Sequence, residues 1–222
     1  MVVEKVFERL SNFTRSPDSS RIIAVTGYQG SGKTTFAGRL ADYAEQNCIS
    51  AIRLSSDTYH KHTRDRKKEI FREVQGNGMD LVRAYELAYE HDLELMARHF
   101  NMIRERQSLS KEGLYQARTG EKDFKLEIDF SQRGETWTFV DGVYVLNSLV
   151  RHMLDAVIFM EASAEVRHTR VGARALQRIN KIKIDPRIME AGDIMNQRWL
   201  DPQRRPEDIV IDNNDYTSPR II

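Results

Sequence analysis

The sequence predicts a three-layer α/β fold with a mainly parallel five-stranded sheet. Short apolar, β-branched runs alternate along the chain with segments of helical spacing. This alternation is typical of a parallel sheet with helices on both faces. A glycine-rich loop, residues 27–34, joins the first predicted strand to the helix that follows it. The length of 222 residues suits one such domain with inserted loops.

The composition is that of a folded globular protein, with 40% hydrophobic and 30% charged residues. Lys plus Arg (34) nearly balances Asp plus Glu (33), so neither nucleic acid nor an acidic membrane surface is an expected partner. The single cysteine, Cys48, allows no intramolecular disulfide, which fits a reducing cytoplasm. Because no apolar run has membrane-spanning length and no signal peptide is recognisable, we expect a cytoplasmic protein without membrane contact.

The N-terminal residues 1–13 predict an amphipathic helix. Its apolar side chains share one face: Val2, Val3, Val6, Phe7, Leu10 and Phe13. Residues 16–20 are typical of a linker, so residues 1–20 are expected to precede a domain that spans 21–222. The helix could dock on its own domain or on a neighbouring subunit of a homo-oligomer, and the sequence does not choose between them.

The loop from Gly27 to Thr34 reads G-x-x-x-x-G-K-[ST], the pattern of a phosphate-binding P-loop. A strand at 21–26 and a helix from about residue 36 flank it, as a P-loop NTPase sandwich requires. Glycines let several backbone N–H groups face one phosphate, and the helix N-terminus adds partial positive charge. Lys33 can reach the β- and γ-phosphates and Thr34 can ligate Mg²⁺, so ATP and Mg²⁺ are the predicted cofactors. The expected nucleotide-binding residues are Gly27, Gly30, Ser31, Gly32, Lys33, Thr34 and Thr35.

Polar residues follow three further predicted strands, at 50–55, 136–140 and 209–211, and another strand is expected at 156–160. These residues are Asp57, Asp141 and Asn213, and ligands of such sheets bind beyond the carboxyl ends of the strands. Asp57 could take a proton from an attacking hydroxyl or hold Mg²⁺, or it could simply cap a helix. Asp141 has the position of a Walker-B acid for Mg²⁺, with a plain turn as the alternative. Gly142 would let a substrate approach closely.

Four arginines recur at three- and four-residue steps in the predicted helix 165–179: Arg167, Arg170, Arg174 and Arg178. A mobile, Arg-rich lid at about 165–205 would neutralise a transferring phosphate and exclude water. The alternative is a solvated basic face.

Other segments carry weaker signals. Residues 80–106 predict a single long helix, and 107–135 predict loops with a small hairpin. His60 and His62 have no metal-ligand partners at useful spacing, so both are interpreted as surface histidines.

Residues from about 21 to 215 resemble the uridine kinase and phosphoribulokinase group of P-loop kinases. The matching segments are Leu54-Ser55-Ser56-Asp57-Thr58-Tyr59, Asp80-Leu81-Val82-Arg83-Ala84-Tyr85-Glu86, Tyr115-Gln116-Ala117-Arg118-Thr119-Gly120, Val140-Asp141-Gly142 and Asp208-Ile209-Val210-Ile211-Asp212-Asn213. The resemblance implies that Asp57 is the catalytic base and Tyr59 lies near substrate. It also implies that Asp80 grips sugar hydroxyls and that Asn213 lies beside the adenine.

The same resemblance assigns Arg170 and Arg174 to phosphoryl transfer, and it assigns Arg167 as a third lid arginine near substrate. Tyr115 and Arg118 fall where uridine kinases contact the base, although loop packing with a solvent salt bridge is an alternative for both. The chain departs from the family pattern after Asp80, where Leu81-Val82 replaces His-Pro. It also lacks the Phe and His that follow Tyr115 in uridine kinases.

The expected function is ATP-dependent phosphoryl transfer to a hydroxyl of a small molecule, with a nucleoside as the leading acceptor. Another sugar, sugar phosphate or vitamin-like alcohol is the alternative within the same group. A regulatory P-loop NTPase, which would bind a macromolecular partner through the basic lid, is the alternative from another class. A kinase-fold chain without activity is opposed by the intact Gly32-Lys33-Thr34 and by Asp57.

Overall fold

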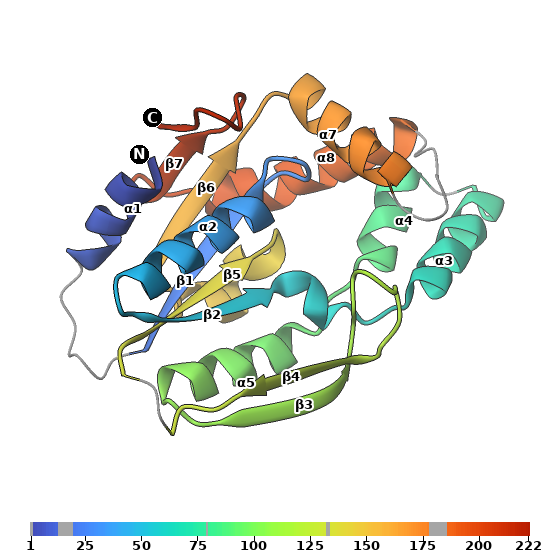
Figure 1. Cartoon of the computed structure of the whole chain (residues 1–222). Helices are drawn as coiled ribbons and strands as arrows, with labels where there is room; N and C mark the ends of the chain where they lie inside the picture. The colour runs from blue at the N-terminus through green and yellow to red at the C-terminus, as the bar shows by residue number, and fades with distance from the viewer. Residues whose placement is uncertain (1, 13–19, 79, 132–133, 178–185) are drawn as a thin grey trace.

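A six-stranded sheet forms the centre of the molecule, with strand order β2-β5-β1-β6-β7-β8. The computed structural model describes residues 2–12, 20–78, 80–131, 134–177 and 186–222 (Figure 1). The strands of this sheet are β1 (Ser20–Gly27), β2 (Ser50–Ser55), β5 (Thr136–Asp141), β6 (Ala156–Glu161), β7 (Ile209–Asp212) and β8 (Arg220–Ile221). The helices are α1 (Val2–Ser11), α2 (Lys33–Gln46), α3 (Arg64–Gly76), α4 (Leu81–Ala88), α5 (Leu93–Arg104), α6 (Ser148–Arg151), α7 (Ala164–Gln177) and α8 (Pro186–Leu200).

All five predicted strands are present and parallel, and the sheet has one more strand than expected. The addition is β8, which pairs antiparallel with β7 through Ile211 and Ile221. A two-residue strand carries no periodic pattern, so nothing in the sequence indicated it. The predicted hairpin also exists, as β3 (Leu109–Leu114) and β4 (Phe124–Ile128).

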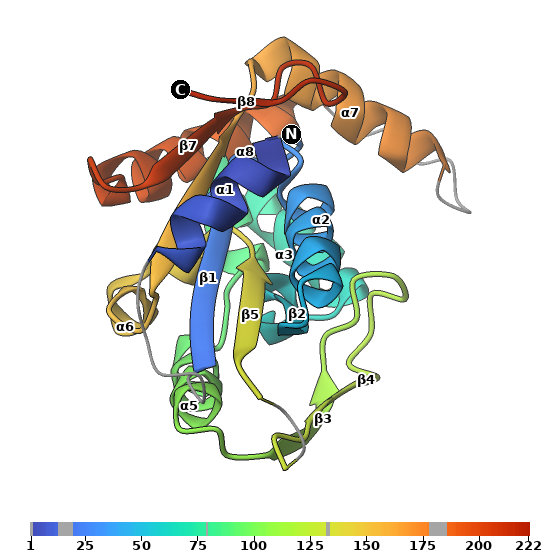
Figure 2. The ribbon, with the colours of Figure 1, turned by 60° about the vertical axis from the view of Figure 1, so that its left-hand side comes forward.

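Helices α1 and α2 cover one face of the sheet (Figure 2). The Phe7 ring stacks on Trp137 with centroids 4.8 Å apart, and Arg21 donates a hydrogen bond to the Leu10 carbonyl at 2.7 Å. The predicted N-terminal helix therefore docks on its own domain. Most of the predicted linker lies in 13–19, outside the described residues.

The single long helix predicted for residues 80–106 is wrong, because the chain forms α4 and α5 with a break between them. Backbone groups in the break pair elsewhere: Asp92 N–H donates to the Tyr59 carbonyl, and Glu90 accepts from the Lys61 N–H. Asp92 also caps α5 by accepting from the Leu95 N–H at 2.9 Å. The break therefore lies against the turn that follows β2.

The predicted lid contains α7, α8 and the short turn Asp201–Gln203. Helix α8 packs on α4, where a Cβ added to Gly192 would lie 2.9 Å from the Tyr85 ring. Arg178, the last of the predicted arginine face, lies outside the described residues. Within the described ranges, no helix is both long and apolar enough to cross a lipid bilayer.

Candidate active site

The P-loop lies between β1 and α2, at the carboxyl edge of the sheet (Figure 1). Gly27, Gly30 and Gly32 all have positive φ (137°, 82° and 97°), a conformation that L-residues rarely adopt. A Cβ at Gly27 would lie 2.2 Å from the Met160 carbonyl oxygen, and one at Gly30 would lie 2.6 Å from the Arg167 carbonyl oxygen. Glycine is therefore required here both by φ and by the close approach of β6 and α7.

Lys33 lies against this loop, and its Nζ donates to the carbonyls of Gly27 and Tyr28 at 2.9 Å each. Burial lowers the pKa of Lys33 to about 8, against the opposing charges of Asp141 and Asp57. The ammonium is thus held where the phosphates of a bound nucleotide would meet it. Ser31 Oγ is buried and has no protein partner among the described residues, which leaves a free group for a phosphate oxygen.

Thr34 and Asp141 contact each other at the start of α2 and the end of β5. Thr34 Oγ1 donates to Asp141 Oδ2 at 2.7 Å. Burial raises the pKa of Asp141, while the Thr34 hydrogen bond opposes that shift. A hydroxyl and a carboxylate form the oxygen ligand set that Mg²⁺ prefers, so these residues fit the predicted metal role. Thr35 is exposed in the first turn of α2.

Asp57 belongs to the 3₁₀ turn Ser56–Tyr59 that follows β2, and its carboxylate is exposed. Gly142 (φ 151°) allows this turn to approach β5, because a Cβ there would lie 1.7 Å from Ser56 Oγ. The sequence suggested that Gly142 lets a substrate approach closely. In the structure, the close neighbour of Gly142 is Ser56. Asp57 and Asp141 therefore line one pocket.

A pocket of about 280 Å³ opens beside the P-loop. Four of the predicted site residues line it together: Thr34, Asp57, Asp141 and Tyr115. They come from α2, the turn after β2, the end of β5 and the loop after β3. The structure therefore brings the predicted metal-binding, catalytic and acceptor residues to one cavity.

On the far side of the P-loop, Asn213 follows β7 and its Nδ2 donates to the Ser31 carbonyl at 2.7 Å. Arg170 in α7 donates to the carbonyls of Asn213 and Asn214, at 2.7 and 3.1 Å. Arg174 is exposed, and its charge is among those that lower the pKa of Lys33. Arg170 thus holds the loop after β7, and the role of Arg174 at the phosphates stays a prediction.

Arg167 is buried within the lid. Its guanidinium forms an ion pair with Asp193 of α8 (Nη1 to Oδ1 2.5 Å, Nη2 to Oδ2 3.0 Å) and donates to the Ala162 carbonyl. It also lies 4.8 Å from the centroid of the Tyr28 ring. Arg167 therefore joins α7, α8 and the P-loop in this structure, and its contact with substrate stays a prediction.

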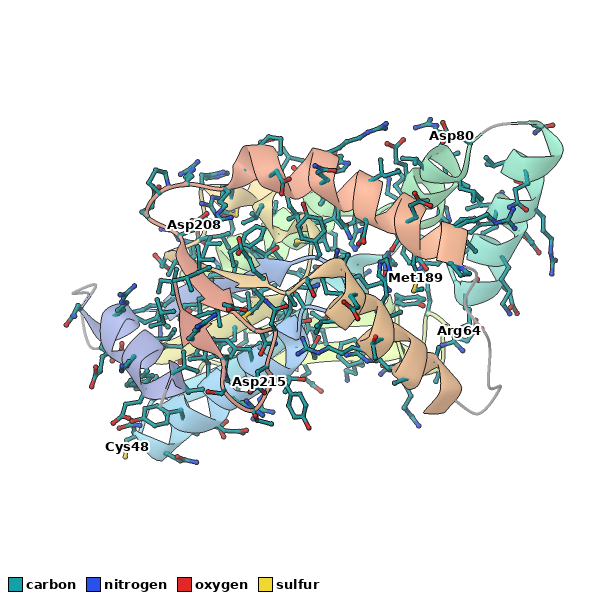
Figure 3. The ribbon with its side chains drawn as sticks, turned by 90° about the horizontal axis from the view of Figure 1, so that it is seen from above. Cys48, Arg64, Asp80, Met189, Asp208 and Asp215 are labelled. Carbon is teal, nitrogen blue, oxygen red and sulfur yellow. The ribbon has the colours of Figure 1, made fainter. Side chains whose placement is uncertain are left out.

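The structure does not bring Asp80, Tyr59 or Arg118 to the centre of the pocket. Asp80 caps α4 by accepting from the Arg83 N–H at 2.8 Å, and Figure 3 places it at the outer end of that helix. Tyr59 is buried, with its hydroxyl 3.1 Å from His99 Nδ1. Arg118 is exposed, and its carbonyl accepts a hydrogen bond from Arg64.

A buried polar cluster beside Asp57 was missed by the sequence reasoning. His60, interpreted as a surface histidine, is buried, and its ring lies 4.1 Å from that of His91, centroid to centroid. Burial lowers the pKa of both histidines well below the usual range. Lys67 of α3 is buried next to them. The one available signal was the polar run 89–92, which interrupts the apolar spacing of the predicted long helix.

Comparison with known proteins agrees with this geometry. The profile of the Phosphoribulokinase / Uridine kinase family matches residues 22–178, more than half of the chain. A uridine kinase of Leuconostoc citreum (strain KM20) is 28% identical over 196 residues, covering 86% of each chain. A uridine kinase of Clostridium botulinum (strain Kyoto / Type A2) is 27% identical, also over 86% of each chain.

Two solved structures share the fold. A protein described as a possible uridine kinase from Bacillus stearothermophilus superposes with a TM-score of 0.65 at 15% identity, covering 94% of this chain and 96% of the other. The phosphoribulokinase from Rhodobacter spheroides superposes with a TM-score of 0.64 at 18% identity, covering 88% and 70%. The family profile, which matches more than half of the chain, shows that the protein is a kinase that belongs to the phosphoribulokinase and uridine kinase family.

Proposed function

We propose that the protein transfers the γ-phosphoryl group of Mg·ATP to a hydroxyl of a small molecule. The observation that carries the proposal is the lining of one pocket by Thr34, Asp57, Asp141 and Tyr115, next to the P-loop. A switch NTPase needs only Thr34 and Asp141, which would hold the metal ion. A kinase also needs a carboxylate that faces the acceptor, and Asp57 supplies it.

The chain divides the work of phosphoryl transfer among three groups. Lys33 and Arg174 offset the negative charge that spreads over the phosphate oxygens. Thr34 and Asp141 would hold Mg²⁺, which would supply further positive charge against the phosphate oxygens. Asp57 orients the acceptor hydroxyl and accepts its proton as the new P–O bond forms, while the bond from the γ-phosphorus to the bridging oxygen breaks and ADP leaves. The lid helices α7 and α8 exclude water, which would otherwise compete with the acceptor.

A nucleoside is the first candidate acceptor, since the curated relatives at 27–28% identity are uridine kinases. Tyr115 could stack on a base from the wall of the pocket. A second candidate is another sugar, a sugar phosphate or a vitamin-like alcohol. The buried Lys67 beside Asp57 favours it, because uracil is neutral and does not need an ammonium group.

The test is ADP release from Mg·ATP with a panel of nucleosides, pentose phosphates and vitamin-like alcohols. Stimulation by one acceptor, reduced about 10²- to 10⁴-fold in the Asp57→Asn variant, is the expected result. Slow hydrolysis that no acceptor stimulates, and that Asp57→Asn leaves unchanged, would overturn the proposal in favour of a regulatory NTPase. Retention of thermal stability in the variant confirms that the loss is chemical.

A further inference from the structure

Three buried nitrogen-bearing side chains lie next to Asp57 and Tyr115, two residues that line the pocket. Lys67, His60 and His91 are 7%, 5% and 6% exposed, and they come from α3, the turn after β2 and the break between α4 and α5. An isolated β-bridge between His60 and His91 holds the last two segments together. Buried polar groups are normally hydrogen-bonded, so groups without protein partners are available to a bound water or ligand.

Lys67 has no oxygen partner among the residues that the structure describes. Its Nζ lies 4.1 Å from the ring centroid of Tyr115 and 4.7 Å from that of Tyr89. Asp57 is the carboxylate whose charge acts on Lys67, and the Arg64 guanidinium opposes it. The ammonium is therefore desolvated by tyrosine rings and only partly neutralised, which leaves its N–H donors available to an anion.

His91 has a defined tautomer. Its Nδ1 lies 2.7 Å from the Tyr89 carbonyl oxygen, which can only accept, so the proton is on Nδ1. The lone pair is then on Nε2, which is buried and has no protein partner within the described chain. Nε2 can accept a hydrogen bond from a hydroxyl. His60 Nδ1 is buried without a partner in the same part of the structure.

A metal site is an alternative interpretation of the same atoms. One ring nitrogen of each histidine and a carboxylate oxygen of Asp57 lie within 4.8 Å of one another. A divalent cation there would lie beside the Lys67 ammonium, and the Arg64 charge adds to the repulsion. An anion meets an attractive potential at Lys67, and hydroxyls match the histidine and carboxylate acceptors. The charge distribution therefore favours an oxygen-rich anion over a cation.

We infer that the phosphate acceptor is an anionic polyol. Its carboxylate or phosphate group binds Lys67, a second hydroxyl donates to His91 Nε2, and the reacting hydroxyl faces Asp57. The inference rests on the proposed kinase function and deepens it by naming the acceptor class. It replaces the neutral nucleoside as the leading acceptor.

The test compares neutral acceptors with partners of the same carbon skeleton that carry a carboxylate or a phosphate, in the Mg·ATP-dependent ADP assay. One set is glycerol, glycerate and glycerol 3-phosphate, a second is ribose, ribonate and ribose 5-phosphate, and uridine is included. We expect the anionic members to have a kcat/KM about tenfold to a hundredfold above their neutral partners. The carboxylate and phosphate members of each set show which anion the pocket takes.

The variant Lys67→Met keeps the aliphatic stem and removes the charge. We expect the KM of the anionic acceptor to rise about tenfold or more, with kcat and the KM of ATP little changed. The preference over the neutral acceptor should disappear. Lys125→Met, which removes an exposed lysine from β4, is the matched control and should behave as the unaltered protein.

Three results would overturn the inference. Uridine or a neutral polyol with a kcat/KM equal to that of the anionic partners would do so while leaving the kinase function intact. An equal loss toward neutral and anionic acceptors in Lys67→Met would show a structural role only. A Co²⁺ absorption spectrum typical of histidine ligation, lost in His91→Ala, would identify a cation site. A panel without any Asp57-dependent stimulation contradicts the kinase function and removes the inference with it.

Discussion

On the nucleotide side of the pocket most polar side chains bind other groups of the protein, with Ser31 Oγ as an exception, and on the acceptor side several do not. Lys33 donates to loop carbonyls, Thr34 to Asp141 and Asn213 to the Ser31 carbonyl. On the acceptor side, His91 Nε2 is buried without a protein partner among the described residues, and Lys67 Nζ lies over the rings of Tyr115 and Tyr89 without an oxygen partner there. Hydrogen bonds within the protein preorganise the nucleotide site, whose ligand has a fixed chemistry. On the acceptor side, polar atoms are left for the substrate to pair.

The largest effect is expected from Lys33→Met, which removes the cation of the nucleotide side. Transition-state charge on the phosphates loses its closest partner, so kcat should fall about 10²- to 10³-fold. Steady-state ADP release measures it, with Lys68→Met on the surface of α3 as control. Activity within twofold of the unaltered protein would mean that Lys33 serves the loop structure alone.

Asp193→Asn tests whether the nucleotide side depends on the lid. The substitution leaves the buried Arg167 guanidinium without its carboxylate, which should lower the free energy of unfolding by about 1–3 kcal/mol. The KM of ATP should rise, because Arg167 contacts Tyr28 of the P-loop. Chemical denaturation and ATP kinetics are the measurements. Asp65→Asn breaks an exposed ion pair and should change neither. An unchanged unfolding free energy in Asp193→Asn would contradict the bridging role of Arg167.

Lys67→Met should stabilise the ligand-free protein at pH 7, which sharpens the contrast between the two sides. Burial lowers the pKa of Lys67 to about 8. The unfolded chain therefore binds more protons than the folded one between pH 8 and the ordinary lysine pKa. The contribution of Lys67 to the free energy of unfolding therefore rises with pH across that window. Below it, the desolvated charge of Lys67 lowers the free energy of unfolding.

Replacing the charge removes the penalty, so the thermal midpoint should increase at pH 7. The difference between variant and unaltered protein should shrink as pH rises from 7.5 to 9.5. Differential scanning calorimetry at several pH values measures both trends. A lower midpoint for the variant at pH 7 would show that protein groups already satisfy Lys67.

The smallest effect is expected from Asp80→Ala. As the N-cap of α4, Asp80 should contribute about 1 kcal/mol to stability and nothing to the KM of the acceptor. Urea denaturation and acceptor kinetics distinguish the two. A several-fold rise in that KM at unchanged stability would restore the prediction that Asp80 grips sugar hydroxyls.

The two sides also differ in how far the sequence predicts them. The P-loop is contiguous, so its residues and their elements can be read from one stretch of chain, and the five parallel strands follow from apolar runs. His60 and His91 are brought together by backbone pairing between residues 59–61 and 89–92, and Lys67 comes from a third segment, α3. No local pattern specifies that pairing. The apolar spacing of 80–106 favoured a continuous helix, and tertiary hydrogen bonds from the Asp92 and Lys61 N–H groups overrode it.

The β-bridge between His60 and His91 has a consequence for how such an enzyme could change its substrate. Its two segments, and the first turns of α3, lie outside the six-stranded sheet. On this proposal, substitutions at positions 60, 67 and 91 would alter what the pocket binds without disturbing β1 and β5, the strands that end at Gly27 and Asp141. The molecule therefore separates the part that must stay fixed for catalysis from a small exchangeable part, an arrangement from which new specificities can evolve by single replacements.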